Sequence, residues 1–203
     1  MAAQILQLDA SGQPVDWITW QDAAIYYAKG QVVWELGSTA STIHGGENRL
    51  TGKQSKIMAA SIIAVKGDTK GRLWKPKATL TNKDLFRRDQ NLCAYCGNVF
   101  GDSKLTRDHI LPKSRGGLDT WTNLVTCCTS CNQFKDDRTP EEAHMPLLYV
   151  PYKPSRAEHL ILENRNVLFD QMQFLLNFIP EDSPIRKKIA AGEIKASGGI
   201  TLQ

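Results

Sequence analysis

Cysteine is the residue type in this sequence whose spacing points most directly to chemistry. Cys93 and Cys96 form one CxxC pair, and Cys128 and Cys131 form a second. Two such pairs supply four thiolates, the number that a tetrahedral Zn²⁺ site takes when no position stays open for a substrate. The spacing therefore predicts a structural zinc site that ties together the two ends of the intervening loop. Free buried thiols or a redox pair are the alternatives, and Cys127 is either a small buried residue or a competing ligand.

Between the two cysteine pairs lie polar residues whose types suit phosphodiester hydrolysis. The imidazole of His109 could accept a proton from an attacking water molecule. The carboxylate of Asp108 and the amide oxygen of Asn132 could share one hard divalent cation, which would offset the charge that develops on the phosphate. An isolated Asp-His pair is common, and His109 could simply be a packed or hydrogen-bonded histidine. Catalysis is favoured because all these residue types occur within one loop that zinc would close.

The distribution of charge along the chain favours a polyanionic partner. Residues 1–48 hold one basic and five acidic residues, whereas residues 49–77 hold eight basic residues and one acidic residue. A basic stretch beside a metal site fits a nucleic acid, with DNA as the first expectation and RNA not excluded. A solvated, lysine-rich connecting segment is the alternative for that stretch. Four further basic residues near the metal site could contact flanking phosphates: Lys113, Arg115, Lys135 and Arg138.

The stretch from residue 93 to residue 138 resembles an HNH endonuclease domain of the kind that carries a four-cysteine zinc site. The resemblance is carried by the two cysteine pairs, Asp108-His109-Ile110 with Pro112, Gly116-Gly117, Asn123-Leu124-Val125, Asn132, Lys135 and Arg138-Thr139. It implies a ββα-metal fold, in which a β-hairpin and the helix after it hold a metal between them. It also implies a metal-dependent endonuclease that hydrolyses DNA.

The resemblance assigns roles to individual residues as well. It implies that His109 is the general base, that Asp108 and Asn132 ligate the catalytic metal, and that Asn123 braces the loop and orients the histidine. Asn132 stands where the family motif has its final histidine, which makes this an H-N-N variant. An amide oxygen favours hard cations, so we expect Mg²⁺ or Mn²⁺ at the catalytic position and Zn²⁺ at the structural one. The segments that flank the core also resemble stand-alone bacterial HNH proteins of about this length.

The elements that must position these residues predict an α+β chain in three parts. Residues 1–77 read as an N-terminal αβ unit with a basic connecting segment, residues 78–145 as the nuclease domain, and residues 146–203 as a wrap, a long helix and a flexible tail. Strands are expected over residues 4–8, 15–18, 31–36 and 57–65, and a helix over residues 20–29. Residues 37–55 are polar and turn-rich and predict a loop. One amphipathic helix is expected over about residues 157–178.

The remaining features bound the class of protein. The composition, 41% hydrophobic and 23% charged, is ordinary for a soluble domain, and no apolar run approaches the roughly 20 residues that cross a bilayer. The N-terminus lacks the pattern of a secretory signal, so we expect a cytoplasmic protein without a membrane partner. A zinc-knuckle module that binds nucleic acid without cutting it, and an RNA-directed nuclease or assembly factor, are the alternative functions. One active site cuts one strand, so a double-strand break would need a homodimer or successive cuts. Trp74, within the basic stretch, is a candidate for stacking on a base.

Overall fold

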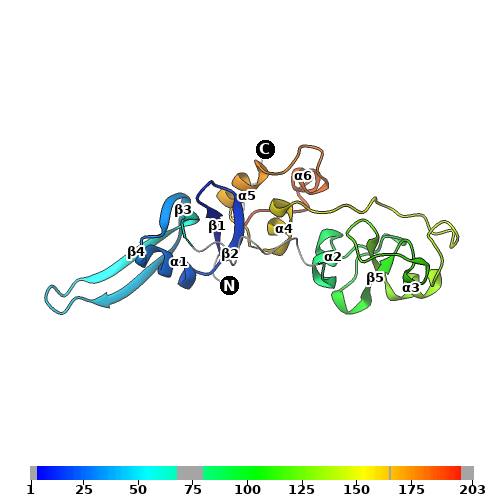
Figure 1. Ribbon diagram of the computed structural model, residues 1–203, viewed down its shortest axis with the longest axis horizontal. Coiled ribbons are helices and arrows are strands. Elements are labelled where there is room, and N and C mark those ends of the chain that lie inside the picture. The colour runs from blue at the N-terminus through cyan, green and yellow to red at the C-terminus, as the bar shows by residue number, and fades with distance from the viewer. Residues whose placement is uncertain (1–3, 68–79, 165, 198–203) are drawn as a thin grey trace. The chain divides into compact units, whose positions relative to one another are not determined.

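The chain folds into two compact units in a computed structural model that describes residues 4–67, 80–164 and 166–197 (Figure 1). The first unit comprises Met1–Lys77 together with Arg156–Gln203, and the second unit comprises Ala78–Ser155. The segments before and after the second unit therefore share one unit. Trp74 and the basic residues around it lie outside the described residues.

A four-stranded mixed sheet lies at the centre of the first unit. Its strands are β1 (Ile5–Asp9), β2 (Pro14–Ile18), β3 (Val32–Glu47) and β4 (Gln54–Val65), in the order β2-β1-β4-β3. β1 and β4 are parallel, and the other two pairs are antiparallel. Helix α1 (Trp20–Ala28) begins after Thr19, whose hydroxyl accepts the backbone N–H of Asp22 at 3.2 Å in a capping box. The sheet and its helix agree with the predicted α+β class.

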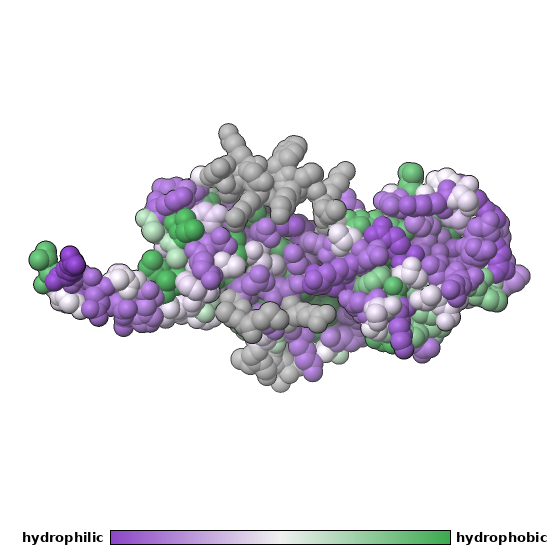
Figure 2. Space-filling model, turned by 90° about the horizontal axis from the view of Figure 1, so that it is seen from below, coloured by the Kyte–Doolittle hydropathy of each residue, from purple (hydrophilic) through white to green (hydrophobic). Residues whose placement is uncertain are grey.

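The prediction of a loop over residues 37–55 is wrong, because β3 and β4 continue through this region as one long antiparallel hairpin. Ile43 pairs with Ile57, His44 with Lys56, and the hairpin reaches well beyond β1 and β2 (Figure 1). The space-filling view shows its outer part as a largely hydrophilic projection (Figure 2). A ribbon that is exposed on both faces has no buried side to impose hydrophobic alternation, which is why its sequence looked like a loop.

The C-terminal part of the first unit contains three short helices, α4 (Arg156–Glu163), α5 (Phe169–Leu176) and α6 (Pro184–Ala190). The single helix predicted over about residues 157–178 is therefore wrong. The side chain of Asn164 accepts the backbone N–H of Asn166 at 2.9 Å. This local turn offers the backbone an alternative to the helical hydrogen-bond ladder, and the chain re-enters a helix only after Leu168.

Buried polar contacts attach these helices to the sheet. Gln171 on α5 is fully buried, and its amide nitrogen donates to the carbonyls of Gln4 and Ser61 at 2.8 Å each. The indole of Trp17 on β2 donates to the carbonyl of Leu160 on α4 at 2.9 Å. Each bond satisfies a polar group that burial would otherwise leave without a partner. The helices after residue 155 therefore complete the core of the first unit.

The second unit is a β-hairpin followed by a helix. Helix α2 (Asn82–Arg88) precedes strand β5 (Leu105–His109), which pairs antiparallel with β6 (Leu124–Cys128), and α3 (Thr129–Lys135) follows directly. The predicted ββα architecture is thus confirmed. A small apolar core supports it, formed by Leu85, Phe86, Leu105, Trp121 and Leu124.

A buried arginine joins the elements of this small unit. Arg88 is 1% exposed, and its guanidinium binds the carboxylate of Asp89 through two hydrogen bonds, at 2.7 and 3.0 Å. It also donates to the carbonyls of Trp121, Leu124 and Tyr152, at 2.5, 2.8 and 3.1 Å. A buried charge is tolerable when it is paired and its donors are satisfied in this way.

Within the described residues no helix is long and apolar enough to cross a membrane.

Candidate functional site

The four cysteines of the two CxxC pairs come together in the second unit. The sulfur atoms of Cys93, Cys96, Cys128 and Cys131 all lie within 4.8 Å of one another. In a tetrahedral site with Zn–S bonds of about 2.3 Å, sulfur atoms lie about 3.8 Å apart, so small side-chain adjustments close the site. Gly97 allows the first pair to turn, with φ of +72° and its N–H bonded to the Cys93 carbonyl at 3.1 Å. The donor set fits a structural zinc ion.

Position distinguishes Cys127 from the four clustered cysteines, because its sulfur lies outside their cluster. Burial alone would raise the pKa of Cys93, but backbone N–H groups of Cys96 and Cys128 donate to its sulfur and lower its pKa to about 7. Cys127 points elsewhere: it is fully buried, and its thiol donates to the Cys128 carbonyl at 3.2 Å. Burial and neighbouring negative charge raise the pKa of Cys127. Cys127 is therefore a packed thiol outside the four-sulfur cluster.

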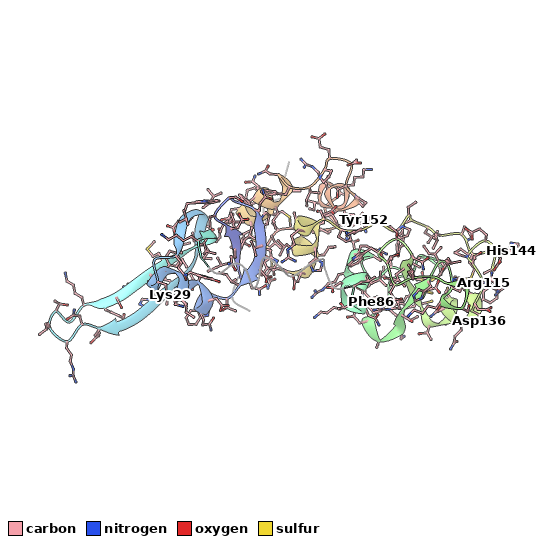
Figure 3. The ribbon with its side chains drawn as sticks, viewed as in Figure 1. Lys29, Phe86, Arg115, Asp136, His144 and Tyr152 are labelled. Carbon is pink, nitrogen blue, oxygen red and sulfur yellow. The ribbon has the colours of Figure 1, made fainter. Side chains whose placement is uncertain are left out.

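Asp108, His109 and Asn132 line one open cleft of about 260 Å³. Asp108 and His109 end strand β5, and Asn132 lies in α3, so the hairpin and the helix each contribute to the cleft. The amide nitrogen of Asn132 donates to the hydroxyl of Thr106 at 3.4 Å, which leaves its carbonyl oxygen as the atom for a cation. The other residues that line the cleft are Arg107, Pro112, Lys113, Ser114, Lys135, Asp136 and Asp137. Figure 3 shows Asp136 with Arg115 and His144 in the same region of this unit.

The carboxylate of Asp108 is buried and fixed by two donors. Its Oδ1 atom accepts from the ammonium of Lys135 at 3.0 Å, and its Oδ2 atom accepts from the hydroxyl of Tyr95 at 2.5 Å. Burial raises the pKa of Tyr95, and so does its bond to Asp108, which keeps the phenol a donor. A carboxylate has about four acceptor positions, so Asp108 retains capacity for a divalent cation. Together with an amide oxygen, this donor set fits Mg²⁺ or Mn²⁺.

Lys135 lies where sequence reasoning did not expect it. Its side chain is 1% exposed, and its ammonium donates both to Asp108 and to the carbonyl of His109, at 3.0 and 2.9 Å. A side chain in this position is not a surface contact for flanking phosphates. The geometry instead makes Lys135 a support for the Asp-His pair. The spacing held a signal for this, because Lys135 follows Asn132 by three residues and therefore shares its face of α3.

The imidazole of His109 contacts a carboxylate that sequence reasoning missed. Its Nε2 atom lies 2.6 Å from Oδ1 of Asp119, and that carboxylate also lies 3.2 Å from the ammonium of Lys113. The hydrogen bonds from His109 and Lys113 hold the pKa of Asp119 below its ordinary value. When Nε2 carries the hydrogen that bonds to Asp119, Nδ1 is the ring nitrogen that remains to accept a proton.

Asn123 closes the loop that connects β5 to β6. Its side-chain nitrogen donates to the carbonyls of Leu111 and Leu118, at 3.1 and 3.0 Å, and its side-chain oxygen accepts the N–H of Leu111 at 2.9 Å. Its backbone carbonyl accepts the N–H of Ile110 at 2.9 Å. At Gly117 a Cβ atom would lie 1.8 Å from the Leu111 carbonyl oxygen, so this close passage requires glycine.

The other predicted phosphate contacts differ in how available they are. Lys113 has a side chain that is 64% exposed. Arg115 is bound to Glu142 at 2.7 Å, and Arg138 donates to the carbonyls of Lys135 and Phe134 while its guanidinium lies over the Phe134 ring. Lys113 is thus the most accessible of the set, whereas both arginines hold local structure in the described residues.

Together, a β-hairpin and a following helix, a four-cysteine cluster and an Asp-His pair at the hairpin end form an arrangement compatible with an HNH core. A family model described as HNH endonuclease matches residues 93–148. Over 60 residues the chain is also 38% identical to the CRISPR-associated endonuclease Cas9 of Corynebacterium diphtheriae. That alignment covers 29% of this chain and 6% of the relative. Residues 93–148 therefore belong to the HNH endonuclease family, as the sequence predicted.

Proposed function

We propose that this protein is a metal-dependent endonuclease that hydrolyses phosphodiester bonds in DNA. The observation that carries the proposal is the cleft in which Asp108, His109 and Asn132 meet. The cleft combines a proton acceptor with two oxygen ligands suited to a hard cation, and these groups suit metal-assisted hydrolysis. The family match over the same residues supports DNA as the substrate class.

Asp108 and Asn132 would hold the catalytic Mg²⁺ or Mn²⁺, while the four cysteines would hold Zn²⁺. When bound, the catalytic cation supplies positive charge that offsets the charge on the phosphate and on the leaving 3′-oxygen. Lys135 and Tyr95 keep the Asp108 carboxylate in place through their hydrogen bonds at 3.0 and 2.5 Å. The Asp108 side chain is thus already oriented before a cation or substrate binds.

His109 would act as the general base. Its Nδ1 atom takes a proton from a water molecule in the cleft, and the water oxygen attacks phosphorus as the bond to the 3′-oxygen breaks. Asp119 accepts the hydrogen of Nε2 and stabilises the imidazolium that forms, since it lies 2.6 Å away. Asn123 holds the loop that carries Asp119. The products would be a 5′-phosphate and a 3′-hydroxyl, the latter formed when the leaving oxygen takes a proton from solvent.

The proposal is tested by incubating zinc-loaded protein with supercoiled plasmid in Mg²⁺, Mn²⁺ or EDTA. We expect nicked circles with either metal and none with EDTA or with His109→Ala. His144→Asn is the matched control, because His144 is exposed, lies in the same unit outside the cleft, and has a φ of +54° that asparagine tolerates. If His109→Ala retains one zinc and cuts as the wild type does, the assignment of the base fails.

A zinc-knuckle module that binds nucleic acid without cutting it is the second candidate. Its prediction is that the wild type holds one zinc and shifts DNA on a gel, yet leaves plasmid intact in every metal. Parallel reactions with a labelled RNA of the same length decide between the two polymers. Linear product that rises with protein concentration before nicked circles accumulate would indicate that two copies act together.

A further inference from the structure

The outer part of the β3–β4 hairpin is an exposed surface of the first unit. We define the arm as residues 44–56, in which every residue is exposed. Both faces of this ribbon meet solvent, although a two-stranded ribbon alone is marginally stable in water. The arm contributes no buried side chain to the core of its own unit, so its surface is available to a binding partner.

The charges of the arm favour a polyanion. The arm carries Arg49, Lys53 and Lys56 against one acidic residue, Glu47. Among the described residues none forms an ion pair with the side chains of Arg49, Lys53 or Lys56. Figure 3 shows long side chains with nitrogen at their ends projecting from the ribbon. Three cations on a narrow projection, without ion-pair partners in the part of the chain that the structure describes, are suited to contact with phosphates.

The tip of the arm is an ordered turn that presents an apolar side chain. The Asn48 side chain accepts the N–H groups of Leu50 and Thr51, at 2.9 and 3.2 Å, and its backbone N–H donates to the Lys53 carbonyl at 2.9 Å. Leu50 stands on this turn with 95% of its surface exposed. The space-filling view shows an apolar spot at the free end of the otherwise hydrophilic projection (Figure 2). An exposed apolar tip between cations has the form of a side chain that inserts into a groove.

The shape of the arm fits a groove of duplex DNA. The major groove of B-DNA, about 12 Å wide, admits a two-stranded β-ribbon. The register shift between His44 and Glu47 marks a bulge, and a bulge increases the right-handed twist of a ribbon. We propose that the arm enters a groove of duplex DNA, with Arg49, Lys53 and Lys56 on phosphates and Leu50 against the base edges. The choice of DNA rests on the proposed function of the nuclease core.

The test measures duplex binding by the full zinc-loaded chain in a His109→Ala background, by fluorescence anisotropy of a labelled 30-base-pair duplex. Replacing Arg49, Lys53 and Lys56 together by alanine should raise Kd roughly 10- to 500-fold at 0.1 M salt. The salt slope, meaning the steepness with which the logarithm of the binding constant falls with the logarithm of the salt concentration, should decrease by about 2.7, because each phosphate contact contributes about 0.9. Leu50→Ser should weaken binding and leave the salt slope unchanged. All four positions are exposed, so these variants should fold as the parent does.

The matched control removes three cations from elsewhere in the same unit. Lys29, Lys187 and Lys195 are exposed, and their triple alanine variant carries the same net charge as the arm variant. We expect a smaller loss of affinity and a smaller change in slope from this control. Equal effects of the two triple variants would overturn the proposal, because net charge alone would then explain binding. An arm variant that changes only the sedimentation coefficient would also overturn it, in favour of pairing between two copies of the chain.

Failure of the arm proposal can be distinguished experimentally from failure of the nuclease proposal. If the chain with His109 intact leaves DNA uncut while the arm variant still loses affinity selectively, the nuclease proposal fails and the arm proposal stands. If the chain nicks plasmid and the arm variant binds duplex as tightly as its parent, the nuclease proposal stands and the arm proposal fails. Selective loss of binding to single-stranded RNA, with duplex binding unchanged, would overturn the assignment of duplex DNA to the arm.

Discussion

The ion pair between Lys135 and Asp108 provides the sharpest test of how the cleft is built. The two side chains are 1% and 6% exposed, and Nζ and Oδ1 are 3.0 Å apart. Lys135→Met keeps most of the aliphatic stem and removes the ammonium. Lys135 and Tyr95 both donate to the Asp108 carboxylate in the wild type, and this variant retains only the hydrogen bond from the Tyr95 hydroxyl.

The magnitude follows from burial. Removing one partner of a buried pair leaves an uncompensated charge and costs about 3–5 kcal/mol, whereas a surface pair is worth about 0–1 kcal/mol. We therefore expect Lys135→Met to lower the free energy of unfolding of the second unit by about 3–5 kcal/mol. Adding Asp108→Asn removes the second charge as well, so the double variant should be more stable than Lys135→Met alone.

Urea unfolding of the zinc-loaded chain measures this difference, and amide hydrogen exchange of β5 and β6 reports the second unit specifically. Lys113→Met is the control, since it removes a lysine from the same cleft whose side chain is 64% exposed. It should cost less than about 1 kcal/mol. A loss of the same size for both variants would refute the reasoning, because burial of the Lys135 ammonium would then have no energetic consequence.

Three further perturbations test other parts of the structure. Asp119→Asn should lower the rate of plasmid nicking roughly 100-fold at constant zinc content, because a positioned base contributes about 10²–10⁴. An unchanged nicking rate would remove Asp119 from the mechanism. Withdrawing zinc with a chelator, or Cys93→Ser, should abolish the hydrogen-exchange protection of β5 and β6 and leave that of β1 and β4 intact; retained protection would mean that the cysteines are not structural. Burial raises the pKa of Asp170, but hydrogen bonds from Ser61 and Ser38 outweigh it and hold the pKa below its ordinary value of 3.8. Ionised Asp170 therefore stabilises the fold above about pH 4, and this contribution is lost as the pH falls through its folded value. The difference in Tm between wild type and Asp170→Asn should shrink at low pH, and a difference that grows would contradict the assignment.

The parts of the site that could be predicted are those in which chemistry and spacing are local. A CxxC pair brings its own two sulfurs together, so four cysteines in two pairs predict their cluster without knowledge of the fold. Asp108 and His109 are neighbours in sequence, and the ββα order was implied by the resemblance that these motifs carry. Asp119 was missed because its bond to His109 depends on how the loop of residues 110–123 folds back.

The parts that could not be predicted depend on tertiary contacts. Arginine is a residue type that is mostly exposed, yet the guanidinium of Arg88 is buried against three carbonyls. The hairpin arm lacks a buried face and therefore lacks the alternation that marks a strand. The prediction of a helix through residues 164–168 failed because the Asn164 side chain accepts the backbone N–H of Asn166, a local hydrogen bond that competes with the helical ladder.

The register of the hairpin indicates how a zinc ion held by the four cysteines would influence the proposed reaction without taking part in it. Leu105 pairs with Cys128 at the zinc end, and Asp108 pairs with Val125, three residues further along the strand. At about 3.3 Å per residue, the Asp-His pair lies about 10 Å along the hairpin from that end, too far for direct contact with zinc. Helix α3 starts at the second cysteine pair and packs against the hairpin, and Lys135 at its end donates to Asp108 and to the carbonyl of His109. Tyr95, within the first cysteine pair, donates to the same carboxylate. A zinc ion in the four-cysteine cluster would therefore fix the start of α3 and the position of Tyr95, and Lys135 would transmit that order to the residues proposed to hold the catalytic cation.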